Sequence, residues 1–283
     1  MKKFLVAIDQ GTTSSRAILF DLDGNIKFTS QFEFNQYFPK NGWVEHNPNE
    51  IWLTTLKALK KVIKKASLLK GKILSIGITN QRETTILWNK KTGKPVYNAI
   101  VWQDRRTSEY CSELATDHNK SIVKEKTGLL IDSYFSATKI KWILDNVEGA
   151  RAKAEAGELC FGTVDTYLMY RLSTGKVFKT DITNASRTML FNINTLRWDD
   201  ELLKLFDIPK SLLPEVVHSD SCFGSLSELG DITIHAVLGD QQAALFGQGC
   251  LEKGQLKSTY GTGCFIMSNV GDEPIHSEDG LLT

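Results

Sequence analysis

A polar turn follows the first apolar segment of the chain and carries the groups that a phosphate requires. Phe4–Ile8 is apolar and ends at Asp9, and Gly11-Thr12-Thr13-Ser14 precedes the next apolar run. Glycine lets the backbone approach a ligand closely, and successive N–H groups in such a turn form an anion-binding concavity. Arg16 adds a charge, and Asp9 is suited to a magnesium ion held mostly through water. The pattern predicts a phosphate and metal site, with an ordinary hairpin turn as the equally simple alternative.

A second Gly-Thr turn lies near the other end of the sequence. Gly261-Thr262-Gly263 separates Gln255–Tyr260 from Cys264–Asn269, so a strand, a Gly-Thr turn and another strand occur twice. Gly-Thr is a common turn dipeptide, so this repeated pattern alone is weak evidence for a shared function of the two turns. The sequence has no G-x-x-x-x-G-K-[ST] loop and no G-x-G-x-x-G entering a helix, which argues against P-loop and Rossmann nucleotide sites.

Polar residues also follow the apolar segment Ile73–Ile78. Asn80-Gln81-Arg82-Glu83 offers donors and acceptors together, which suits a ligand with neutral hydroxyl groups. A surface loop of paired charges explains these residues equally well. Trp102 ends another predicted strand and would form a flat apolar wall, although a tryptophan in the core is the commoner role.

An aspartate opens the last predicted helix of the chain. Gly239-Asp240-Gln241-Gln242 follows the apolar segment Ile232–Leu238. Helix N–H groups would keep the Asp240 carboxylate ionised, so that it accepts a proton from a substrate hydroxyl. The alternative is a helix-capping aspartate without a chemical role.

These residues are predicted to lie on a mixed sheet with flanking helices. Phe4–Ile8, Arg16–Phe20 and Ile26–Phe34 predict a meander, and Asn47-Pro48 begins a helix. Strands and helices then mix along the chain, which indicates an α/β fold other than a plain doubly wound sheet. The further predicted strands are Ile73–Ile78, Thr84–Trp88, Val96–Trp102, Leu159–Gly162, Ile232–Leu238, Gln255–Tyr260 and Cys264–Asn269; the further helices are Thr107–Asp117, Ser136–Asn146 with Trp142 buried, Gly149–Ala156, Thr163–Leu172 and Gln241–Gly249.

The composition is that of a soluble globular protein. The chain has 283 residues, 41% of them hydrophobic, and a net charge of +1, which gives no electrostatic support for nucleic acid or an anionic membrane as partner. Its five cysteines form no C-x-x-C pair, which indicates reduced thiols in a cytoplasmic protein. Phe4–Ile8 is too short for a signal peptide or a membrane span.

Eight stretches of the sequence carry a resemblance to a known family. They are IDQGTTSSRAILFD (8–21), GITNQRETT (77–85), WQDRR (102–106), YFSATKIKW (134–142), GTVDTYLMYRL (162–172), TNASRTMLFNI (183–193), GDQQAALFGQ (239–248) and STYGTGCF (258–265). Together they resemble the FGGY family of carbohydrate kinases. The motif Tyr134-Phe135-Ser136-x-x-Lys139-x-x-Trp142 is diagnostic of that family, and Asn80–Thr84 is more typical of its glycerol-specific branch than of pentulose or gluconate kinases.

The resemblance implies an actin-like, ribonuclease-H-like fold of two domains with a nucleotide cleft between them. It implies transfer of the γ-phosphoryl group of ATP, with Mg²⁺, to glycerol, giving sn-glycerol 3-phosphate in a cytoplasmic protein that is a homo-oligomer at full length. Residues 1–250 would form the N-terminal domain and 251–283 the opening hairpin of an incomplete second domain. The family's adenosine-binding motif is not in this sequence, so we expect little kinase activity from the 283 residues alone.

The resemblance also assigns roles to single positions, and it implies that both Gly-Thr turns bind phosphate. Asp240 matches the catalytic base and Asp9 the magnesium carboxylate. Phosphate contacts match Gly11, Thr12, Thr13, Ser14 and Arg16 in the first turn and Thr262 in the second. Polar contacts to glycerol match Arg82, Glu83, Tyr134, Asp240 and Gln241, and aromatic walls match Trp102 and Phe265.

Other functions stay open at this stage. A truncated module that binds a polyol or phosphate without turnover would expose an apolar face. A pentulose kinase is a rival within the family. A nuclease needs clustered carboxylates for two metals, and the first strand offers only Asp9. Segment 219–238 lacks the loop that binds fructose 1,6-bisphosphate in some members, and neither His218 nor His235 matches the histidine phosphorylated in others.

Overall fold

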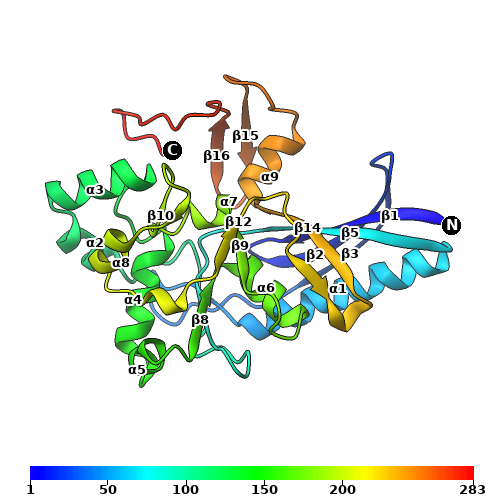
Figure 1. Cartoon of the computed structure of the whole chain (residues 1–283), viewed down its shortest axis with the longest axis horizontal. Helices are drawn as coiled ribbons and strands as arrows, with labels where there is room; N and C mark the ends of the chain where they lie inside the picture. The colour runs from blue at the N-terminus through cyan, green and yellow to red at the C-terminus, as the bar shows by residue number, and fades with distance from the viewer.

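The centre of the molecule is a six-stranded mixed sheet (Figure 1). The computed structural model describes residues 1–283, the side chain of Glu228 excepted. The strand order is β13-β14-β5-β1-β2-β3; β1, β5 and β14 are parallel, and the other three are antiparallel to their neighbours. The strands are β1 (Lys2–Gln10), β2 (Ser14–Asp21), β3 (Ile26–Glu33), β5 (Gly71–Asn80), β13 (Gly224–Leu226) and β14 (Ile232–Gly239). The predicted meander and mixed α/β architecture are confirmed.

The three parallel strands end at the same level of the sheet. Gln10 of β1 pairs in register with Asn80 of β5, and Asn80 pairs with Gly239 of β14. The segments that follow these three residues therefore leave the sheet side by side. They are the first Gly-Thr turn, the loop that begins at Gln81, and helix α9 (Asp240–Gly247). This register is what brings the predicted site residues to one edge.

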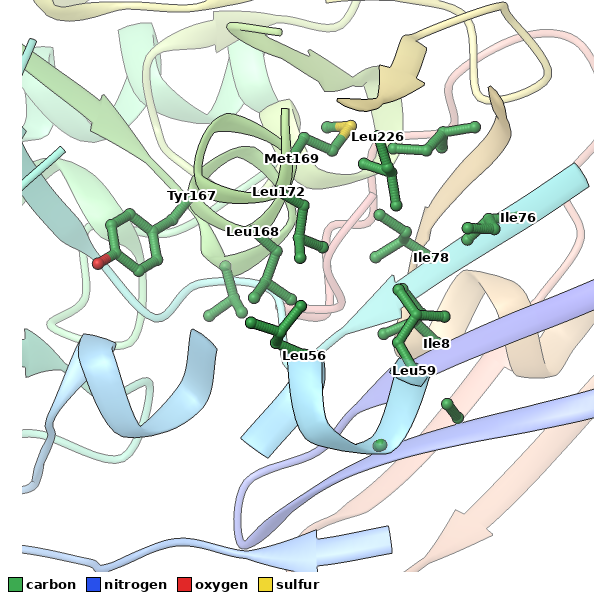
Figure 2. Close-up of a cluster of buried hydrophobic side chains, with 14 of the residues drawn as sticks. Ile8, Leu56, Leu59, Ile76, Ile78, Tyr167, Leu168, Met169, Leu172 and Leu226 are labelled. Carbon is green, nitrogen blue, oxygen red and sulfur yellow. The ribbon is translucent and has the colours of Figure 1, made fainter. Parts of the chain in front are cut away.

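Helices α1 (Pro48–Leu68) and α6 (Val164–Leu172) cover one face of the sheet. Asn47 caps α1 as predicted, because its side chain accepts a hydrogen bond from the Asn49 N–H. Figure 2 shows Leu59 of α1 and Leu168 of α6 packed toward Ile8 and Ile78 of the sheet. Each of these side chains is at least 98% buried, and each such burial contributes about 1.5–3 kcal/mol to folding. The core therefore holds β1 and β5 rigidly under the site.

A second hydrophobic cluster joins the short helices of the central region to β6 and β8. In Figure 1 these helices lie to the left of the sheet, on the side toward which β1 and β5 run. They are α2 (Ser108–Leu114), α3 (Asp117–Thr127), α4 (Ser136–Asn146), α5 (Ala150–Glu155) and α8 (Asp200–Leu205), with β6 (Ile86–Asn89) and β8 (Leu159–Gly162). The remaining elements are β4 (Glu45–His46), β7 (Ala99–Ile100), β9 (Lys179–Asp181), α7 (Ile182–Ala185), β10 (Phe191–Asn192), β11 (Arg197–Trp198), β12 (Glu215–Val217), β15 (Leu256–Tyr260), β16 (Cys264–Ser268) and 3₁₀ turns at Lys210–Leu212 and Ser227–Leu229.

Three sequence predictions were wrong in this second region. The helix predicted at Thr107–Asp117 ends at Leu114, and α3 begins after it with Thr116 as its cap; α3 buries only Val123 and Thr127, so it lacks an apolar stripe that periodicity would detect. The strand predicted at Val96–Trp102 contracts to β7. Trp142 is half-buried rather than buried, with its ring edge-on to Trp43.

The hairpin β15–β16 stands beyond α9 at the top of Figure 1. Its two strands pair from Leu256–Ser268 to Tyr260–Cys264, around the predicted second Gly-Thr turn. The domain boundary predicted at residue 250 falls between α9 and this hairpin and stays a prediction. Among the described residues, none of the helices combines the length and the hydropathy needed to span a membrane.

Candidate active site

A pocket of about 200 Å³ lies at the edge where the parallel strands end. Thr12 of the first Gly-Thr turn lines it, and so does Gly261-Thr262-Gly263 of the second. The two turns therefore face one cavity, although about 250 positions separate them in the sequence. Typical drug-sized ligands occupy roughly 300–1,000 Å³, so a pocket of this volume suits a smaller molecule.

Arg82 connects three walls of the pocket. Its Nη2 donates to the Tyr134 hydroxyl over 2.9 Å, and its Nε lies 3.1 Å from Oδ1 of Asp240. Arg82 is 96% buried and has a φ of +56°. A non-glycine residue in that left-handed region is strained, and such strain is found where the surrounding structure fixes a side chain for function. The surface-loop alternative for this segment is thus excluded.

Glu83 is completely buried and shares its charge with two arginines. Its Oε1 accepts from Arg187 Nε over 2.7 Å and lies 3.8 Å from Arg82 Nε. Burial alone would raise the pKa of Glu83, but the two guanidinium groups outweigh it and hold the pKa below the usual value. Within the described side chains, Glu83 Oε2 accepts no hydrogen bond. A buried carboxylate oxygen without a donor points to a ligand that supplies one.

Sequence reasoning missed Arg187, which is 93% buried behind Glu83. The guanidinium lies 5.0 Å from the centre of the Phe135 ring, on the segment that carries Tyr134. A cation had to be present somewhere, because an isolated buried carboxylate is too costly to remain ionised. The burial of Glu83 is seen only in the structure, so the sequence alone held no signal that singles out Arg187.

Gln241 is oriented by a residue that the sequence analysis also missed. Lys257, on β15, donates to the Gln241 side-chain oxygen and, over 2.7 Å, to the Thr259 hydroxyl. Because the Gln241 oxygen is occupied by Lys257, the amide NH₂ group is the part of this side chain that faces acceptors, and the neighbouring Asp240 carboxylate is one of them. Lys257 thus joins α9 to the hairpin.

Asp240 lines the same pocket and keeps an accessible carboxylate. Its side chain is 37% exposed. Burial raises the pKa of the Asp240 carboxyl above its usual value, while the neighbouring Arg82 opposes the rise. Within the described side chains, Oδ1 accepts no hydrogen bond. The ion pair between Oδ1 and Arg82 Nε favours the charged form of the carboxylate, and the exposed part of the side chain lies at the pocket.

Aromatic rings form the apolar side of the pocket, as predicted for Trp102 and Phe265. The centres of these two rings are 6.1 Å apart, and the Arg82 guanidinium lies 5.3 Å from the Phe265 ring. Trp102 Nε1 also donates to the Thr12 hydroxyl over 3.1 Å, which ties the wall to the first Gly-Thr turn. An arrangement of polar groups facing aromatic rings suits a short polyol, whose carbons and hydroxyls need opposite surroundings.

Gly263 sets the position of the two aromatic walls. A Cβ atom there would lie 2.7 Å from the Phe265 ring and 3.5 Å from the Trp102 ring. We expect Gly263→Ala to displace Phe265 and to weaken ligand binding about tenfold, since overpacking costs about 1–3 kcal/mol. The measurement is calorimetric titration with glycerol. Gly247→Ala is the control, because its Cβ would meet nothing within 4 Å; equal affinities for the two variants would contradict the expectation.

The first turn contributes less of its length to the pocket than predicted. The turn is closed by a hydrogen bond from Gly11 N–H to the Ser14 carbonyl at 2.9 Å. Thr12 lines the pocket, whereas Gly11, Thr13, Ser14, Arg16 and Asp9 are not part of its lining. Arg16 instead donates to Gln31 over 3.0 Å and lies 3.7 Å from Asp9.

Asp9 supplies one carboxylate at the end of β1, a ligand type that magnesium takes. The Asp9 side chain is 37% exposed at the end of β1. Partial burial raises the pKa of its carboxyl group, while the neighbouring Arg16 opposes the rise. Among the described residues, no three His, Cys, Asp or Glu side chains gather as a metal cluster. Magnesium commonly takes one or two carboxylates and completes its shell with waters and substrate phosphates, so a single carboxylate is compatible with it.

The family of this chain follows from a match over most of its length. Residues 4–247 match the family described as the FGGY family of carbohydrate kinases, N-terminal domain. The chain belongs to the FGGY family of carbohydrate kinases. The actin-like fold predicted for it is confirmed by this match and by the solved structures that it resembles.

Among individual proteins, the chain is similar to glycerol kinases. It is 57% identical to the glycerol kinase of Petrotoga mobilis over 286 residues, covering 100% of this chain and 57% of that protein. The crystal structure of Plasmodium falciparum glycerol kinase with ADP matches with a TM-score of 0.93 at 38% identity, covering 99% of this chain and 57% of that one. Xylulose kinase from Lactobacillus acidophilus matches with a TM-score of 0.82 at 22% identity, covering 93% of this chain and 54% of that one, which supports the fold alone. The chain thus spans somewhat more than half the length of these relatives.

Proposed function

We propose that this protein transfers the γ-phosphoryl group of ATP to the terminal hydroxyl of glycerol, giving sn-glycerol 3-phosphate. The observation that carries the proposal is the small pocket in which Arg82, Glu83 and Asp240 present polar atoms opposite two aromatic rings. The identity to glycerol kinases over the whole chain supports the same substrate. Phosphoryl transfer depends more on positioning the reacting groups and neutralising their charge than on covalent chemistry. The side chains that line the pocket would position glycerol.

The buried polar atoms would read the hydroxyl groups of glycerol. Glu83 Oε2 lacks a donor and would accept from one hydroxyl, while the Gln241 NH₂ group would donate to another. The Tyr134 hydroxyl accepts from Arg82 and would donate its own proton to a ligand oxygen. A site of this kind rejects molecules without hydroxyls, because its buried polar groups would then stay unpaired.

Asp240 would act as the general base. The attacking hydroxyl must lose its proton as the phosphoryl group arrives, and Asp240 places a carboxyl group whose side chain is 37% exposed at the pocket. Glu83 is a weaker candidate for the base, because Arg187 and Arg82 neutralise its charge and hold its pKa low. The two carboxylates would therefore have different roles, one in binding and one in proton transfer.

The two Gly-Thr turns would hold the ATP phosphates. Thr12 and Thr262 line the pocket, and Gly11, Thr13, Ser14 and Arg16, which are close to Thr12 in the sequence, would complete the phosphate contacts of the first turn. Asp9 would hold Mg²⁺, which when bound neutralises phosphate charge. Closure of the pocket would exclude water, which competes with glycerol for the phosphoryl group.

The test is a kinase assay on a version of the protein as long as its relatives. We expect ATP-dependent formation of sn-glycerol 3-phosphate, with kcat/KM for glycerol at least about a hundredfold above that for xylulose, because a mismatched hydroxyl pattern leaves buried groups unpaired. Preference for xylulose would replace glycerol kinase by pentulose kinase. Glycerol binding without any turnover would favour the alternative of a polyol-binding module.

A further inference from the structure

A buried polar network lies beneath the pocket and centres on Asp181, which caps α7. Asp181 Oδ1 accepts from the Asn184 N–H over 3.0 Å and from its side-chain amide over 2.7 Å. Oδ2 accepts from the Thr183 N–H over 2.9 Å, the Thr183 hydroxyl over 2.6 Å and the Ser219 hydroxyl over 2.7 Å. Asp181 is completely buried, and neither it nor Thr183 lines the pocket. The pocket chemistry described above therefore leaves this network without a role.

The network ends at the residue that precedes Asp240. The Gly239 N–H donates to the Thr183 hydroxyl oxygen over 2.8 Å. A hydroxyl has one proton to donate, and a carboxylate can only accept. Asp181 therefore takes the Thr183 proton, which leaves the Thr183 oxygen to accept from Gly239. The Asp181 carboxylate thus fixes the direction of both hydrogen bonds, from the Thr183 hydroxyl to Asp181 and from the Gly239 N–H to Thr183.

The Arg82 side chain also packs closely against Gly239. A Cβ atom at this position would lie 2.8 Å from Cγ and 2.9 Å from Cδ of Arg82. The backbone that carries Asp240 is thus in contact with both the Thr183 hydroxyl and the Arg82 side chain. On the neighbouring strand, the Asn80 side-chain amide donates to Asn184 over 3.0 Å, so the same network also holds the end of β5.

We propose that Thr183, oriented by Asp181, is the positioning residue of Asp240. It fixes the Gly239 N–H, and through it the direction in which the Asp240 carboxylate enters the pocket. This inference rests on the proposed function, in which Asp240 is the base. Thr183 does not line the pocket, so its contribution is to geometry: reacting groups must be held closely, and a misplacement of about 1 Å costs about a hundredfold in rate.

The test compares Thr183→Val with Thr183→Ser in a version as long as the relatives. Valine keeps the shape but removes the hydroxyl, and serine keeps the hydroxyl but removes a methyl group. We expect Thr183→Val to lower kcat by about 10–100-fold with KM for glycerol changed less than about threefold, the pattern of an interaction needed in the transition state. Thr183→Ser should retain most of the turnover. Faster hydrogen exchange at the Gly239 amide in Thr183→Val is the accompanying physical readout.

The relative turnover rates of the two variants distinguish a positioning role of Thr183 from a packing role. If the side chain only fills space, Thr183→Ser is the slower variant and Thr183→Val is close to wild type, which would overturn the inference. Rates are divided by the concentration of glycerol-binding sites, so a smaller folded fraction does not imitate a loss of kcat. Unchanged Gly239 exchange in Thr183→Val would also overturn the inference. If the wild-type protein itself does not phosphorylate glycerol, the proposed function fails instead, and the exchange measurement still tests the contact.

Discussion

Asp240→Asn is expected to lower the rate of phosphoryl transfer by about 10²–10⁴-fold, the usual contribution of a general base. Asparagine has nearly the same shape, but its neutral amide cannot take the proton of the attacking hydroxyl. Glycerol binding should persist, because Glu83, Tyr134 and Gln241 remain in place around the pocket. The measurement is single-turnover formation of glycerol 3-phosphate, in a version of the protein as long as its relatives, together with calorimetric titration of glycerol.

The pH profile gives this prediction a second readout. Burial raises the pKa of Asp240 above the ordinary 3.8, and the base acts only when it is deprotonated. We therefore expect kcat/KM of the wild type to fall as the pH drops through a value above 3.8. Asp272→Asn, at an exposed position outside the pocket, should leave rate and profile unchanged. A wild-type rate in Asp240→Asn would exclude Asp240 as the base.

Arg187→Met is expected to lower the free energy of unfolding by about 3–5 kcal/mol, the cost of leaving a buried charge without its partner. Glu83 would keep only Arg82, whose Nε is 3.8 Å away, in place of the 2.7 Å hydrogen bond from Arg187. Arg105→Met is the matched control. It removes an ion pair with Asp132 whose side chains are 58% and 44% exposed, and such pairs contribute at most about 1 kcal/mol. Urea unfolding of both variants gives the comparison.

The double variant Glu83→Gln/Arg187→Met separates stability from binding. Removing both charges leaves no uncompensated carboxylate, so most of the lost stability should return. Glycerol affinity should stay about 10–100-fold below that of the wild type, because a hydrogen bond to a charged acceptor contributes about 1.5–3 kcal/mol. Equal costs for Arg187→Met and Arg105→Met would contradict the buried-pair account. Full recovery of glycerol affinity in the double variant would exclude Glu83 as a ligand-binding carboxylate.

Periodicity and capping in the sequence predicted the elements that carry the site. The meander, helix α1 from its Asn47 cap, and α4 over Ser136–Asn146 agree with the structure because each has a strong local signal. Helix α3 was missed, since most of its surface is exposed and its apolar pattern is weak. Local signals fail where an element is stabilised mainly by contacts with distant segments.

The types of the site residues, and their positions at the ends of apolar segments, were determined by the sequence itself. Asp240, Arg82 and Thr12 could be named because turn residues after buried strands stand out against the apolar runs. Only the tertiary structure decided which of them meet. The pairing of Gln10, Asn80 and Gly239 brings three segments to one edge, and no local pattern contains that register. Arg187, Lys257 and Thr183 became visible for the same reason: their roles are defined by hydrogen-bond partners on other segments, and burial makes those partners obligatory.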